Sequence, residues 1–215
     1  MTFAAVIQKI RFRLRRFPLP EVSNWDMAVG VTLLSAWQLI GNVGGMIGLF
    51  PVLIIAGIAV LVSAASLREC YYSPALRALG WTVPSTRFFP IAIVSGLLAA
   101  FSVALVVHAT GIKMIRGPLP IEVLAFTVGP IVEESFFRGF LQPWLAASAG
   151  ATPAVLGTAF IFAAVHGPTS FLQLSCFTAM GAAYSLLRLR SGSVFSSTLM
   201  HSTYNLAILL MSGSK

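Results

Sequence analysis

The chain has 215 residues, of which 57% are hydrophobic and 9% are charged, and its formal net charge is +8. Because soluble domains carry about 25% charged residues, this composition and a mean hydropathy of +0.89 exclude the soluble classes and predict a polytopic helical membrane protein. A basic balance can also indicate nucleic-acid binding, but no hydrophilic domain is present to support it, so we expect no nucleic-acid partner.

The first 20 residues are predicted to form an amphipathic helix on the membrane surface. Apolar residues recur at spacings of four and three between positions 3 and 17, and basic residues occupy the opposite side, namely Lys9, Arg13 and Arg16. Prolines at positions 18 and 20 end the pattern. Such a helix binds anionic lipid headgroups through its basic face. An unstructured basic arm is the alternative.

About seven transmembrane helices are predicted from the long apolar runs that follow. Residues 27–67 contain no charge, which is room for two helices at about 20 residues each. The other spans are 88–108, 119–147, a fifth from the turn at 150–153 to 166–168, 170–187 and 193–211. With no internal repeat to divide it, the chain is predicted to be an all-α membrane bundle and a single domain over 1–215.

The basic residues predict the orientation of this bundle, because Lys and Arg accumulate on the cytoplasmic side. With the N-terminus inside, ten fall in cytoplasmic segments and three outside. The ten are Lys9, Arg11, Arg13, Arg15, Arg16, Arg68, Arg77, Arg87, Arg188 and Arg190, and the three are Lys113, Arg116 and Lys215. We therefore expect an integral protein of a bacterial inner (cell) membrane with a cytoplasmic N-terminus.

Two adjacent glutamates, Glu133 and Glu134, stand in an apolar stretch of the fourth predicted span and are two of only six acidic residues. A carboxylate at bilayer depth costs about 2.5–3.5 kcal/mol or more, so such residues are functional by default. Arg138 follows Glu134 by one helical turn and can neutralise it through a charge-assisted hydrogen bond. Glu133 is then left to exchange protons. The alternatives are a structural charge pair between helices or the lining of a transport path.

Two of the three histidines lie in predicted spans, each four residues from a partner on the same helix face: Phe162 with His166, and His201 with Asn205. At about 1.5 Å per residue, Glu133 and His166 lie about 21 Å from the cytoplasmic ends of their spans and His201 about 13 Å. Within boundary errors, all three can share one layer. Glu133 and His166 can then deprotonate a water, while His201 and Asn205 donate to an oxyanion. A helix cap, interhelical hydrogen bonds and plain packing are the structural alternatives.

The ordered motifs Glu-Glu-x-x-x-Arg, Phe-x-x-x-His and His-x-x-x-Asn resemble the CPBP family of intramembrane proteases. That family includes the type II CAAX prenyl endopeptidases and the bacterial Abi and bacteriocin-processing proteins. The resemblance covers residues 121–210 and implies a helical bundle with a membrane-embedded catalytic cavity. It implies that Glu133 and His166 activate water and that His201 and Asn205 stabilise the oxyanion. The supporting residues would be Glu134, Arg138 and Phe162.

The resemblance leaves the choice between a metal-dependent and a glutamate mechanism open. No cofactor is expected; a divalent metal such as zinc, if bound, would be held by Glu133, His166 and His201. Other intramembrane proteases are excluded by the residues themselves. No histidine is followed by glutamate, so a His-Glu-x-x-His zinc motif is absent, Asp26 is the sole aspartate, and no Gly-x-Ser-Gly occurs.

The sequence therefore predicts an intramembrane endopeptidase that cleaves a membrane-associated or C-terminal peptide or protein substrate. Two other classes stay open, because a fold can lose its activity. One is a non-catalytic scaffold or immunity protein that sequesters a peptide and tolerates the loss of His166. The other is a proton-coupled transporter that uses Glu133 as its relay and moves its substrate intact.

Overall fold

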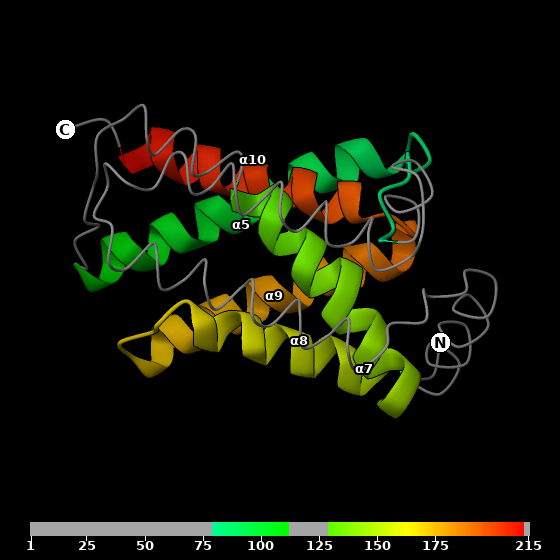
Figure 1. Cartoon of the computed structure of the whole chain (residues 1–215). Helices are drawn as coiled ribbons and strands as arrows, with labels where there is room; N and C mark the ends of the chain where they lie inside the picture. The colour runs from blue at the N-terminus through cyan, green and yellow to red at the C-terminus, as the bar shows by residue number, and fades with distance from the viewer. Residues whose placement is uncertain (1–78, 112–128, 213–215) are drawn as a thin grey trace, which may run out of the picture.

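The structure is a computed structural model that describes residues 79–111 and 129–212. Over these ranges it contains helices and turns and no strand (Figure 1). The helices are α5 (Phe88–Thr110), the π-helix η1 (Ser135–Leu141), α7 (Gln142–Ala149), α8 (Ala151–Val165), α9 (Phe171–Ser191) and α10 (Val194–Ser212). The predicted surface helix over 1–20 and the two spans over 27–67 lie outside the described residues.

The helices fall where the apolar runs predicted them. The run at 88–108 is α5, and the last three runs are α8, α9 and α10, each with ends within a few residues of the prediction. The glutamate-bearing run is helical over 129–134 and continues through η1 and α7. Glycines end two of these elements: Gly150 (φ 89°) separates α7 from α8, and Gly192 (φ 73°) caps α9.

Within the described part of the chain, α5 is the helix that is long and apolar enough to cross a bilayer alone, with a mean hydropathy of 2.4 over its best window. Helix α8 is apolar but only 15 residues long. Helices α9 and α10 contain polar side chains, which lower the mean hydropathy of both helices. Several of these side chains are buried against neighbouring helices, including Ser185, Ser196, Ser197 and Thr198. The seven predicted spans therefore stay a prediction.

Two helix pairs enclose the glutamate-bearing helix. Helix α5 packs along α10 and α8 along α9, while η1 and α7 cross between the pairs (Figure 1). Each pair makes a close contact at a glycine. A Cβ at Gly96 would come within 2.6 Å of the Met200 carbonyl oxygen, and one at Gly181 within 3.0 Å of the Ala159 Cα. Such small residues let helix backbones approach closely in membranes.

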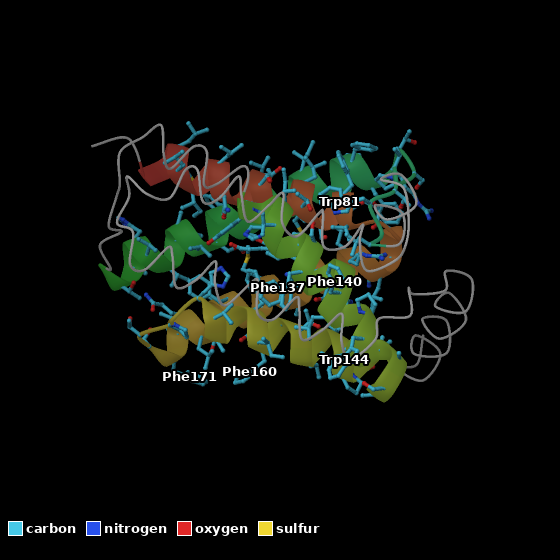
Figure 2. The ribbon with its side chains drawn as sticks, in the orientation of Figure 1. Trp81, Phe137, Phe140, Trp144, Phe160 and Phe171 are labelled. Atoms are coloured by element: carbon cyan, nitrogen blue, oxygen red, sulfur yellow. The ribbon has the colours of Figure 1, made fainter. Side chains whose placement is uncertain are left out.

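The centre of the bundle is aromatic. Phe136, Phe137 and Phe140 of η1 are buried against Phe162 of α8 and Tyr184 of α9. Phe137 and Phe140 lie in the middle of the molecule, whereas Phe160 and Phe171 lie at its rim (Figure 2).

The exposed face of α5 is also apolar, as expected of a lipid-facing surface, and consists of Ile91, Val94, Leu97, Leu98, Phe101 and Leu105.

A turn at residues 79–82 ties the glutamate-bearing helix to the start of α10. The Trp81 indole Nε1 donates to the Ser135 hydroxyl at 3.0 Å, directly after the two glutamates. The Val194 amide donates to the Gly80 carbonyl at 2.8 Å. Because Trp81 is bonded to the first residue of η1 and Gly80 to the first residue of α10, this turn fixes where η1 begins relative to α10.

Candidate active site

The two glutamates immediately precede a π-helix. Residues 129–134 are α-helical, and the chain then widens into η1, whose seven residues are all buried. Short π-helical turns occur frequently at functional sites. No residue pattern predicted this one. It places Glu133 and Glu134 at the junction between two helix types, with successive side chains turned toward different neighbours.

Glu134 and Arg138 form a closed ion pair. Arg138 Nη1 lies 3.0 Å from Glu134 Oε1, and both side chains are fully buried. Arg138 Nη2 donates to the Gly181 carbonyl of α9 at 2.7 Å. The guanidinium carbon also lies 4.8 Å from the Phe162 ring centroid and 5.3 Å from that of Tyr184. The charge of Arg138 is therefore enclosed by a carboxylate, a carbonyl and aromatic faces.

His201 joins this pair from α10. Its Nδ1 lies 3.1 Å from the same Glu134 Oε1 that accepts from Arg138. A carboxylate oxygen only accepts, so the contact places a proton on Nδ1. The other ring nitrogen, Nε2, takes no part in this contact. The four-residue spacing links His201 to Asn205 and does not predict this contact, which joins residues 67 positions apart.

Glu133 faces His166 at the end of α8, and this pair is more open. The side chains are 18% and 26% exposed, against 0% and 6% for Glu134 and His201. The His166 Nδ1 lies 2.6 Å from the Phe162 carbonyl, so Nδ1 carries the proton and Nε2 is the free base. Nε2 lies 3.6 Å from Glu133 Oε2, which is too long for a direct hydrogen bond, and this oxygen is buried with no hydrogen-bond partner among the described residues.

Phe162 separates the two histidines and contacts both. Its ring centroid lies 4.3 Å from that of His166 and 5.8 Å from that of His201. Sequence reasoning treated Phe162 as packing with a supporting role implied by the resemblance. The structure places it at the centre of the site.

Tyr184 is a site residue that sequence reasoning missed. Its ring stacks on His201 with centroids 4.6 Å apart and planes at 19°. It is one of four tyrosines in the chain and stands in the apolar run that forms α9. The signal available in the sequence was a tyrosine in an apolar run, because a buried tyrosine hydroxyl usually needs a hydrogen-bond partner.

Asn205 is half-buried on α10, one turn beyond His201. Its side chain makes no hydrogen bond to the described residues. The structure thus brings Glu133, Glu134, His166 and His201 together around one aromatic wall, with Asn205 on the next turn of α10.

Among residues 79–111 and 129–212, no three His, Cys, Asp or Glu side chains gather in a group that could hold a metal ion. His201 is bonded to Glu134, beside the Arg138 cation, rather than converging with Glu133 and His166. The set predicted for zinc, Glu133, His166 and His201, does not form such a group among the described residues.

Residues 115–207 match the family model described as type II CAAX prenyl endopeptidase Rce1-like. The match covers a little under half of the chain and includes all three motifs. It confirms the resemblance that the motifs predicted. No curated protein and no solved structure matches the chain.

Proposed function

We propose that this protein is an intramembrane endopeptidase that hydrolyses a peptide bond of a membrane-associated or C-terminal peptide. The observation that carries the proposal is the Glu133–His166 pair. Two hydrogen-bond acceptors, a carboxylate oxygen and an unprotonated imidazole nitrogen, face each other at 3.6 Å. A water can donate one hydrogen to each, which leaves its lone pairs free to attack a carbonyl carbon.

The reaction then follows from these groups. Water forms a C–O bond to the scissile carbonyl while its proton passes to the Glu133–His166 pair. The tetrahedral intermediate collapses by breaking the C–N bond, and the pair returns the proton to the leaving amine nitrogen. Glu133 serves in both directions, as base and then as acid. No bound metal is required by these steps.

His201 and Asn205 supply the stabilisation of the oxyanion. Because Nδ1 of His201 is engaged by Glu134 at 3.1 Å, a proton on Nε2 makes the ring an imidazolium held beside a buried carboxylate. The Asn205 amide on the next turn is a second donor. Removing one such donor typically lowers the rate by about 10²–10³-fold.

The membrane setting of this proposal is a bacterial inner membrane with the N-terminus in the cytoplasm, as the distribution of basic residues indicates. Anionic lipids would neutralise the cytoplasmic basic residues, and a peptide or protein substrate would enter the site from the bilayer or its surface.

The test is peptide cleavage, followed by mass spectrometry in liposomes, for wild type, Glu133→Gln and His166→Ala, each with and without a chelator. We expect both variants to lose cleavage, because each removes one of the two acceptors that hold the water. His108→Ala is the matched control, since His108 lies exposed near the end of α5. The chelator separates a metal-dependent reaction from a glutamate reaction. Cleavage that survives both substitutions would refute the assignment.

A further inference from the structure

The stacking between Tyr184 and His201 differs from the other ring contacts in the site. The planes of this pair meet at 19°, whereas the contacts of Phe162 and His166 with their neighbours are tilted or edge-on, at 41–85°. In a face-to-face contact, neither ring can tilt out of its plane without meeting the other ring. Tyr184 is only 1% exposed, so its own ring has little freedom to move.

His201 needs such a contact because its one hydrogen bond does not fix its plane. The bond from Nδ1 to Glu134 Oε1 anchors one edge of the ring at 3.1 Å. The imidazole plane tilts by rotation about the Cβ–Cγ bond, and one hydrogen bond at the edge of the ring tolerates a moderate tilt that would swing Nε2 away from a substrate carbonyl. A second contact on the ring face removes that freedom, and Tyr184 provides it.

The backbone that carries Tyr184 is itself held against the glutamate-bearing helix. Arg138 donates to the Gly181 carbonyl at 2.7 Å, and Gln142 donates to the Ser185 carbonyl at 3.1 Å. The two donors are four residues apart, and so are the two acceptors, which bracket Tyr184 on α9. The glutamate-bearing helix therefore sets the position of the tyrosine and, through Glu134, that of the histidine.

We propose that Tyr184 is a positioning residue that fixes the plane of the His201 imidazole and so directs Nε2 toward the carbonyl oxygen of the substrate. The inference rests on the proposed function and adds a residue that acts through His201. The ring does this rather than the hydroxyl, because the Tyr184 hydroxyl oxygen is buried with no hydrogen-bond partner among the described residues. An electron-rich phenol face also suits a charged imidazole.

The kinetic test compares Tyr184→Phe, which keeps the ring, with Tyr184→Leu, which removes it. We expect Tyr184→Phe to cleave at close to the wild-type rate. Tyr184→Leu should lower kcat on the order of 10²-fold with KM nearly unchanged, because misplacing a catalytic group by about 1 Å has an effect of that size. Phe140→Leu is the matched packing control, since Phe140 is buried in the same core and has no ring contact with His201.

A spectroscopic test measures the stacking directly. The chain has three histidines, so labelling histidine alone gives three ring signals, which single His→Gln variants assign. We expect the ring protons of His201 to be shielded by the Tyr184 ring in wild type and in Tyr184→Phe. The shielding should be lost in Tyr184→Leu or, should that variant not fold, in Tyr184→Met.

The proposal would be overturned by unshielded His201 protons in wild type, or by Tyr184→Phe losing as much activity as Tyr184→Leu. A Tyr184→Leu variant with wild-type kcat would also overturn it. Failure of the proposed function gives a different pattern. In that case His201→Ala cleaves like wild type, or no form cleaves, while the shielding of His201 in wild type still reports whether Tyr184 orients the ring.

Discussion

Adjacent carboxylates in this chain have opposite environments because successive helical side chains point about 100° apart. Glu134 points into the bundle, where Arg138 and His201 engage the same oxygen. Glu133 points toward the end of α8 and keeps 18% of its side chain exposed. Glu134 is therefore held in a buried ion pair, whereas Glu133 stays partly exposed and is the carboxylate to which the proposed function assigns the chemistry.

The buried pair makes a prediction that separates stability from activity. Arg138→Met should lower the free energy of unfolding by about 3–5 kcal/mol, because it leaves the Glu134 carboxylate beside His201 without its cation. The double variant Glu134→Gln/Arg138→Met should recover much of that loss, since it removes both charges. It should nonetheless remain inactive, because His201 has lost its carboxylate.

Thermal unfolding in detergent and peptide cleavage measure the two effects. Arg138→Lys is the matched control: it keeps the charge but has no planar fork to reach both the carboxylate and the Gly181 carbonyl, so it should rescue stability only in part. A double variant that is less stable than Arg138→Met would contradict the argument.

At the site, sequence spacing predicted the contacts that run along one helix, and the depths of the residues in their spans placed Glu133 beside His166. Neither predicted the other contacts between helices. The four-residue spacings of Glu134 with Arg138 and of Phe162 with His166 both correspond to contacts in the structure. The contacts of His201 with Glu134 and Tyr184 do not follow from spacing. They depend on how α10 and α9 pack around η1, and nothing local to those residues encodes that packing.

Among the elements, the two helix pairs depend on contacts that exclude a side chain. Gly96 lies where α5 crosses α10, and an added Cβ would come within 2.6 Å of the Met200 carbonyl oxygen and 2.9 Å of the Thr203 Cβ. Both neighbours belong to α10, and His201 of the site lies between them in the chain. Any displacement of α10 by this contact is therefore transmitted to His201 and its partners.

Gly96→Ala should lower stability by about 1–3 kcal/mol, because the backbone atoms it meets cannot move without separating the helices. It should also lower kcat by moving His201 relative to Glu134.

Gly157→Ala on α8 is the matched control, since its Cβ would meet only the flexible end of Leu145 at 3.3 Å. Alanine favours a helix over glycine by up to about 1 kcal/mol, so the control should be neutral or stabilising. Thermal unfolding and cleavage rates are measured for both variants. A Gly157→Ala variant that is destabilised, together with a Gly96→Ala variant of wild-type stability, would contradict the prediction.

For the whole molecule, the apolar runs and their glycine punctuation predicted the helices because membrane burial leaves few alternatives to helical backbone. The arrangement of the helices was not predictable in the same way. The close approach at Gly96 and the bonds from the turn at 79–82 to Ser135 and Val194 are long-range contacts. The sequence marks them only as small or polar residues in apolar runs.

The orientation of the bundle gives the last prediction. Helix α8 joins the exposed end of α7 at Ser148 to the exposed loop at Thr169, so these two positions lie at opposite ends of one short helix. The excess of basic residues in the predicted inner loops predicts that Ser148 lies in the cytoplasm and Thr169 outside. In a variant without Cys70 and Cys176, Thr169→Cys should react with a membrane-impermeant maleimide applied to intact cells. Ser148→Cys should react only after permeabilisation.

Both positions are exposed at the ends of α8, so a difference in their labelling reports the side of the membrane on which each lies and not a difference in accessibility. The opposite labelling pattern would invert the bundle and move the Glu133–His166 pair nearer the cytoplasmic face.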